Sequence, residues 1–117
     1  MEGFEVVFYR KANGVEPVRE FIETLSPKLR AKMGRDLAKL EELNIGLREP
    51  YAKYLGEELF ELRIGQGGDI ARAFYFFYER RRIVVTNGFI KKSDKIPKRE
   101  MERARRYKRD WEERRPE

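Results

Sequence analysis

Two residue types that carry much of enzyme chemistry are missing from this chain. It has no cysteine, which excludes disulfide bonds and thiolate metal sites. It has no histidine either, so it lacks the commonest general base and the commonest metal ligand. Any catalysis must therefore depend on lysine, arginine, glutamate, aspartate or tyrosine side chains. We expect neither a metal ion nor another cofactor.

Long apolar runs are missing as well. No stretch approaches the roughly 20 apolar residues that are needed to cross a bilayer. The first residues do not show the basic segment followed by an apolar run that marks a secretory signal. We therefore expect a cytoplasmic protein that does not associate with membranes. Its 117 residues are the length of one domain, which we place at 1–117.

What the chain has in abundance is charge. Charged residues make up 41% of it, against about a quarter in an ordinary globular protein. The formal net charge is +6, and residues 91–117 contain 12 Lys and Arg against 7 Asp and Glu. Most of the excess positive charge therefore lies in the last quarter of the chain. This surplus favours an anionic partner, although a charged helix is also compatible with a simply solvated face.

The spacing of apolar residues predicts an α+β fold. Helical spacing in two early segments predicts an αα-hairpin, and a later change to period 2 predicts a three-stranded antiparallel meander. The predicted elements are a strand at 4–9, an αα-hairpin at 17–45, strands at 59–64, 70–78 and 83–90, and a helix after Pro97. The last helix has an apolar stripe that we assign to core packing, made of Met101, Ala104, Tyr107 and Trp111.

One charge stands out within the predicted sheet. Arg72 is the only charged residue between Ile70 and Tyr78, where an isolated charge is costly unless it is paired or used. Strand pairing brings Arg63 onto the same face, and two neighbouring guanidiniums repel each other unless an anion lies between them. Two alternatives follow. Either Glu61 pairs with the arginines in a structural role, or the arginines clamp a phosphate, whose geometry suits the guanidinium fork.

A group of cations follows the last predicted strand: Lys91, Lys92, Lys95, Lys98 and Arg99. From their charge alone, they belong to a solvated loop and helix start. If the end of the strand lies beside Arg72, they extend an anion-binding site instead. The glycine-rich segment 65–69 lies between two strands rather than before a helix. We therefore interpret it as a hairpin turn and not as a phosphate-binding loop.

The predicted central strand is rich in aromatic residues, which alternate between its two faces. We expect Tyr75 and Phe77 to be buried in the core. Phe74 and Phe76 share the face of Arg72, and we expect them to stay open to solvent. On an open face Phe74 is a candidate for stacking on RNA bases.

Three short motifs, in this order, resemble the RelE/ParE toxin superfamily, and within it the HigB-like branch that includes phage-derived toxins. The motifs are Leu59-Phe60-Glu61-Leu62-Arg63, Arg72-Ala73-Phe74-Tyr75-Phe76, and Gly88-Phe89-Ile90-Lys91-Lys92 with Pro97. The resemblance covers residues 4–107. It implies a RelE-like fold and a toxin of a type II toxin–antitoxin system.

The resemblance also implies an activity, which is metal-independent, ribosome-dependent cleavage of messenger RNA by attack of a ribose 2′-OH on the adjacent phosphate. It implies catalytic roles for Arg72 at the phosphate, for Arg63 and Lys92 as further cations, and for Glu61 as general base. The implied RNA contacts are Lys91, Lys95, Lys98, Arg99 and Phe74. Relatives place a His or Tyr near the C-terminus as the acid for the leaving group. This chain has no His, so the acid stays open.

The partners implied by the resemblance are a cognate helix-turn-helix antitoxin, the ribosome and messenger RNA, with operator DNA reached only through the antitoxin. Two other functions fit the same fold. A ParE-like protein inhibits DNA gyrase without being an enzyme, and a non-catalytic relative only binds nucleic acid. The clustering of Arg63, Arg72 and Lys92 favours the ribonuclease, because a gyrase inhibitor has no need to gather phosphate ligands on one face of a sheet.

Overall fold

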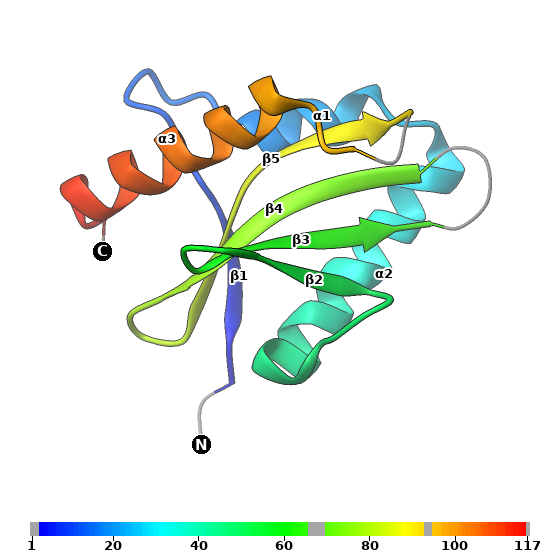
Figure 1. The fold of residues 1–117 in the computed structure, drawn as a ribbon, viewed down its shortest axis with the longest axis horizontal. Helices are drawn as coiled ribbons and strands as arrows, with labels where there is room; N and C mark the ends of the chain where they lie inside the picture. The colour runs from blue at the N-terminus through cyan, green and yellow to red at the C-terminus, as the bar shows by residue number, and fades with distance from the viewer. Residues whose placement is uncertain (1–2, 66–69, 93–94, 117) are drawn as a thin grey trace.

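The computed structural model describes residues 3–65, 70–92 and 95–116. Within these ranges the chain forms a five-stranded sheet, three α-helices and one short 3-10 helix (Figure 1). In chain order the elements are β1 (Glu5–Phe8), α1 (Pro17–Thr24), α2 (Pro27–Leu43), η1 (Asn44–Gly46), β2 (Ala52–Gly56), β3 (Leu59–Ile64), β4 (Ile70–Tyr78), β5 (Arg82–Lys91) and α3 (Lys98–Arg114). The predicted α+β architecture is confirmed, with its αα-hairpin and its C-terminal helix. None of the helices in the described ranges is long and apolar enough to cross a membrane.

The strands lie in the order β1-β5-β4-β3-β2. β3, β4 and β5 form the predicted antiparallel meander, and β1 pairs with β5 in parallel. β2 adds an antiparallel edge strand beside β3, in a segment where the apolar pattern of the sequence predicts no strand. Because β4 lies between β5 and β3 in this order, it is a central strand, as expected. The predicted glycine-rich turn at 65–69 lies mostly outside the described residues.

Each face of the sheet has its own helical cover. α1 and α2 cover one face, and the larger core there includes Val18, Met33, Leu40, Leu62 and Tyr75. α3 covers the other face through the predicted stripe, since Ala104 packs with Phe74, and Tyr107 and Trp111 pack with Phe76. In Figure 1, α2 passes behind the strands and α3 runs along the β5 side.

Local sequence signals explain where the helices of the hairpin begin. Pro17 stands at the start of α1 and Pro27 at the start of α2, where the missing backbone N–H of proline is not needed. The Ser26 hydroxyl accepts a hydrogen bond of 3.2 Å from the backbone N–H of Leu29, which caps α2. The second helix of the predicted αα-hairpin therefore begins at Pro27, with Ser26 as its N-cap.

Two tight hairpin turns contain charged residues where glycine or asparagine is usual. Glu57 and Glu58 connect β2 to β3 with φ of 51° and 63°, and Arg80 and Arg81 connect β4 to β5 with φ of 62° and 55°. Two consecutive positive φ angles are the requirement of a type I′ hairpin turn. The first of these turns precedes β3 and the second falls between the predicted strands at 70–78 and 83–90.

Polar contacts fasten the C-terminal half of α3 to the residues that directly follow β1. The Tyr9 hydroxyl donates a hydrogen bond of 2.5 Å to Oδ2 of Asp110, and the Tyr9 ring stacks on Tyr107 with centroids 4.6 Å apart. Arg114 pairs with the same Asp110 carboxylate at 2.7 Å and also donates to the backbone carbonyl of Arg10. Burial and the Asp110 carboxylate raise the pKa of Tyr9 to about 12.

This contact predicts how stability responds to alkaline pH. The unfolded chain releases the Tyr9 proton near pH 10 and the folded chain near pH 12, so the stability that Tyr9 contributes is full below pH 10 and is lost between these values. Tyr9→Phe should lower the free energy of unfolding near neutral pH by about 2 kcal/mol, because it removes a hydrogen bond to a carboxylate. Urea unfolding across this pH range should show a smaller alkaline loss in Tyr9→Phe than in the wild type. Parallel losses in the two proteins would contradict the assignment.

Gly88 predicts a second effect on stability. A Cβ at this position would lie 2.5 Å from Cδ2 of Phe21 and 2.9 Å from the backbone carbonyl oxygen of Arg72, so α1 packs against β5 only because no side chain is there. Gly88→Ala should lower the free energy of unfolding by about 2 kcal/mol through overpacking. Gly34 in α2 has nothing within 4 Å of the same added atom, and Gly34→Ala should raise stability by up to about 1 kcal/mol. Urea denaturation of both variants checks the opposite signs.

Candidate functional site

The central feature of the site is a pair of arginines that face each other across two strands. The register of β3 and β4 places Arg63 opposite Arg72 and Glu61 opposite Phe74. Since alternate residues of a strand share a face, Glu61, Arg63 and Arg72 all lie on the face that α3 partly covers. The predicted meeting of Arg63 and Arg72 is therefore confirmed. We call these three residues the Glu61 cluster.

Glu61 lies between the two guanidiniums. Its Oε1 is 3.6 Å from Nε of Arg63, and its Oε2 is 3.5 Å from Nε of Arg72. This is the structural ion pair that was one of the two alternatives from the sequence. The formal charge of the cluster is still +1, because one carboxylate faces two cations. The cluster is thus held together by Glu61 without being neutralised by it.

The Glu61 cluster is buried yet incompletely hydrogen-bonded. Glu61 is 1% exposed and Arg72 is 6% exposed, whereas a quarter of the Arg63 side chain remains accessible. Arg72 donates one hydrogen bond of 3.1 Å, from an Nη to the carbonyl of Ala71. Within the described ranges, Oε2 of Glu61 and Nε of both arginines are buried without a hydrogen-bond partner. Buried groups of this kind retain unused capacity to bind a charged ligand.

The charge on Arg72 is subject to opposing influences. Burial lowers the pKa of its guanidinium, the Glu61 carboxylate raises it, and the like charge of Arg63 lowers it again. An arginine starts far above neutral pH, so Arg72 remains protonated in the cell. Arg72 therefore acts as a fixed positive charge and cannot exchange protons with a substrate.

The aromatic rings on this face are closed off, which corrects one prediction. Phe74 is 0% exposed and Phe76 is 1% exposed, so the prediction that they stay open is wrong. α3 lies over both, and Phe74 additionally stacks on Phe89 with centroids 5.5 Å apart. In this structure Phe74 presents no free ring face to an RNA base. Tyr75, in contrast, is buried on the opposite face as predicted.

Of the predicted cations, the strand register places only Lys91 close to the Glu61 cluster. Arg72 pairs with Phe89 and Ile70 pairs with Lys91, so Lys91 is one step further along the strand on the face of Arg72. Lys92 is exposed just beyond β5, and in the described part of the chain it forms no hydrogen bond or ion pair with the cluster. The other three predicted cations are also exposed, at the approach to α3 or in its first turn: Lys95, Lys98 and Arg99.

A second cationic region was not predicted. A cleft of about 490 Å³ lies between α1, β5 and α3, and Lys11, Arg103 and Arg106 are among its lining residues. Asn87, which also lines it, donates a hydrogen bond of 3.3 Å to the Glu100 carboxylate. The only sequence signal for this region is the polar Asn87 inside an apolar strand. Lys11 is far away in sequence, in a loop with no recognisable pattern.

Comparison with protein families matches residues 20–109 to the phage-derived Gp49-like protein family (DUF891). The match spans most of the chain, from α1 into α3. The chain belongs to this family. No curated protein matches the chain.

Gp49-like proteins are a RelE/HigB-like toxin-type family and are associated with the toxins of toxin–antitoxin systems. The expected membership in a toxin class is thereby supported at the level of the family, and a cognate antitoxin is the implied partner. The matched segment contains all three residues of the Glu61 cluster and every cation of the 91–99 region. The site thus belongs to the part of the chain that is Gp49-like.

The geometry of this Gp49-like site predicts the effect of removing the central carboxylate. Glu61→Gln keeps the shape but leaves two buried like charges without a counter-charge, so it should lower the free energy of unfolding by about 3 kcal/mol. Added sulfate should then raise the melting temperature of Glu61→Gln more than that of the wild type, because the anion replaces the lost carboxylate. Glu57→Gln is the matched control, since Glu57 is 80% exposed and its ion pair with Arg105 is worth little. Equal melting temperatures for the two variants would contradict this account.

Proposed function

We propose that this Gp49-like protein is a toxin that cuts messenger RNA on the ribosome without a metal ion, by attack of a ribose 2′-OH on the adjacent phosphate. The observation that supports this function is the Glu61 cluster, with two arginines on one sheet face, a residual positive charge and unused hydrogen-bonding groups. The reaction gathers negative charge on a phosphate, and fixed guanidiniums stabilise such charge. The exposed cations of the 91–99 region would hold the flanking RNA backbone.

The differing exposure of the two arginines assigns them different parts in this proposal. Arg63 is the more accessible, so an incoming phosphate meets its guanidinium first. Arg72 lies behind it and adds a second fixed charge to the developing transition state. Lys92 would contribute from the loop, as the family resemblance implies.

The proposal considers two roles for Glu61, one structural and one as the general base. It holds both arginines in place, which the distances of 3.5 and 3.6 Å already describe. To act as the general base as well, its carboxylate must be reached by the 2′-OH, although it is 1% exposed. A pH–rate profile separates these parts, because only a base gives an acidic limb that disappears when the carboxylate is replaced.

The partner belongs to the proposal as well. We propose that the cognate antitoxin implied by the family carries a helix-turn-helix domain, and that operator DNA is reached only through it.

Expression of the chain without this antitoxin should stop translation quickly, with messenger RNA cut inside open reading frames. Intact translation with collapsed DNA supercoiling would indicate a gyrase inhibitor and would overturn the ribonuclease.

The decisive prediction concerns the arginines. Arg63→Ala and Arg72→Ala should each lower the rate of cleavage of ribosome-bound messenger RNA by about 10²–10³-fold, as for the loss of one preorganised charge-stabilising donor. Ribosome binding should change little, because affinity for RNA is spread over many cations. The measurement is single-turnover cleavage at saturating protein, alongside a binding titration.

A charge-matched control comes from the exposed Arg109 in α3, since Arg105 is already paired with Glu57 at 3.0 Å. Arg109→Ala should leave the bound-state cleavage rate unchanged. Thermal melting must confirm that both cluster variants fold, because Arg72 is also a structural partner of Glu61. Folded Arg63→Ala and Arg72→Ala proteins that cut at the wild-type rate would exclude the Glu61 cluster as the active site.

A further inference from the structure

The cleft between α1, β5 and α3 lies where the sheet leaves a strand edge uncovered. β1 pairs with β5 only as far as Val85, so in the described chain the rest of the outer edge of β5 has no strand partner. Asn87 and Gly88 from this stretch of β5 line the cleft, and both α1 and α3 lie on the β5 side of the sheet (Figure 1). We call this feature the Lys11 cleft, after the cation that enters it from the loop before α1.

The Lys11 cleft is separate from the Glu61 cluster. The cluster belongs to β3 and β4, whereas the cleft lies at the far edge of β5. α3 presents different residues to the two sides. Arg103 and Arg106 line the cleft, but Arg105 pairs at 3.0 Å with Glu57, in the turn between β2 and β3. The cleft therefore lies on the β5 flank of α3, and the strand that contains Glu61 lies toward the other flank.

The lining of the Lys11 cleft has a surplus of positive charge. It contains three cations, Lys11, Arg103 and Arg106, against the single acid Glu20. Arg103 is paired with Glu100 at 3.2 Å, just outside the lining. Three cations against these two acids leave a formal charge of +1. Lys11 and Arg106 form no ion pair within the described ranges, so their charges remain available to an anion.

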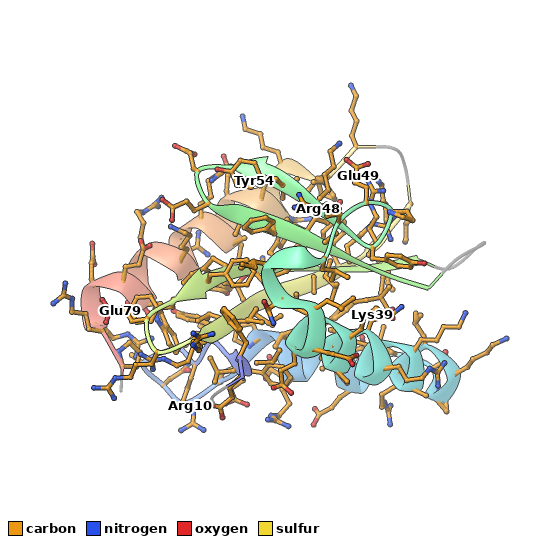
Figure 2. The ribbon with its side chains drawn as sticks, turned by 90° about the horizontal axis from the view of Figure 1, so that it is seen from below. Arg10, Lys39, Arg48, Glu49, Tyr54 and Glu79 are labelled. Atoms are coloured by element: carbon orange, nitrogen blue, oxygen red, sulfur yellow. The ribbon has the colours of Figure 1, made fainter. Side chains whose placement is uncertain are left out.

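Lys11 reaches the cleft from a loop whose backbone is held by hydrogen bonds. Its N–H donates to the carbonyl oxygen of Val15 at 2.8 Å, and its own carbonyl oxygen accepts from the N–H of Gly14, also at 2.8 Å. Figure 2 shows the preceding residue, Arg10, well apart from Tyr54 on β2. Lys11 is therefore a cation of the β1 side of the molecule, and its backbone is in place before a ligand arrives.

Tyr107 supplies both a ring that positions a cation and a hydroxyl group. The guanidinium of Arg106 lies 5.6 Å from the centroid of this ring, which in turn stacks on Tyr9. The Tyr9 hydroxyl is used on Asp110, but the Tyr107 hydroxyl forms no hydrogen bond within the described ranges. Arg106 is thus positioned by a cation–π contact, and the Tyr107 hydroxyl is available to donate to an oxygen of a ligand.

The row of cations on α3 favours a chain of phosphates over a single anion. Arg99, Arg103 and Arg106 follow one another at spacings of four and three residues, so they share one flank of the helix. At 1.5 Å per residue the row is roughly 10 Å long, which exceeds the size of one phosphate group. Arg99 also belongs to the exposed cations of the 91–99 region, so the row connects that region with the cleft.

We propose that the Lys11 cleft binds the phosphate backbone of an RNA strand, with Lys11 and Arg106 on its phosphate oxygens and the Tyr107 hydroxyl as a further donor. The proposal rests on the proposed action of the chain on RNA, but not on cleavage at the Glu61 cluster. Contacts of this kind go to phosphates and carry no information on base sequence. The cleft therefore adds affinity without sequence preference, on the other flank of α3 from the phosphate that is cut.

An RNA that cannot be cleaved tests this proposal on the purified chain. The probe is a fluorescently labelled 2′-O-methyl RNA of about a dozen nucleotides, which lacks the attacking 2′-OH. Lys11→Ala and Arg106→Ala should each weaken its binding about fivefold in fluorescence anisotropy. Each should also reduce the slope of log K against log salt by about 0.7, as for one lost phosphate contact to a single strand. Tyr107→Phe should weaken binding about threefold without changing the slope, because it removes a neutral donor.

Two further variants provide the controls. Arg109 is exposed on α3, does not line the cleft and forms no ion pair in the described chain. Arg109→Ala removes the same charge as Arg106→Ala and should weaken binding of the probe less than about twofold. Arg106→Lys keeps the charge and should restore the salt slope of the wild type. Thermal melting checks that the Tyr107→Phe protein, which keeps the buried ring, is folded.

Several results would overturn the proposal. Equal losses in Arg106→Ala and Arg109→Ala, or salt slopes unchanged in Lys11→Ala and Arg106→Ala, would show that the cleft makes no phosphate contact of its own. A polyglutamate peptide of the same charge that competes as well as RNA would assign the cleft to an acidic protein segment. Inorganic pyrophosphate that displaces the probe at an equal concentration of phosphate groups would assign it to a small anion. Because the probe cannot react, failure of the cleft and failure of the ribonuclease are separable.

Discussion

Two arginines stand directly opposite each other on the paired strands β3 and β4, and this like-charge contact is tolerable only because Glu61 lies between them. The pairing of β3 with β4 in this register is what brings the charged residues of the Glu61 cluster together. A slip of one residue would turn Arg63 and Glu61 to the face of α1 and α2, into an apolar core. The site and the sheet therefore depend on the same pairing, and the site cannot be weakened without some loss of stability.

α3 determines how much of this site is open. Its apolar stripe lies over Phe74 and Phe76, and its C-terminal half is fastened through Asp110 to Tyr9, directly after β1. Its outer surface carries much of the excess positive charge of the chain. One helix thus closes the aromatic part of this face, while a quarter of the Arg63 side chain remains accessible. The apolar face of α3 buries the aromatic residues of the sheet, and the charged face of the same helix adds positive charge to the surface.

Most of the fold followed from local patterns, and the exceptions have physical reasons. The period-2 pattern and the isolated Arg72 predicted β3 to β5 and the meeting with Arg63. β2 was missed because the turn that joins it to β3 consists of two glutamates, which carry no turn signal of their own. The burial of Phe74 was missed because the stripe on α3 reveals that the helix packs but not on which face of the sheet. The extent of exposure at the site is a tertiary property that no local pattern contains.

The parallel pairing of β1 with β5 has a consequence for the order of folding during synthesis. β1 is made well before its strand partner, since Glu5 pairs with Arg82 and Phe8 with Val85. At 5–20 residues per second, roughly 4–15 s separate their appearance from the ribosome. α3 follows later still, so an unfinished chain displays Phe74, Phe76 and the Glu61 cluster to solvent. In the growing chain the charged cluster is hydrated, and it loses that water only when the last helix closes over it.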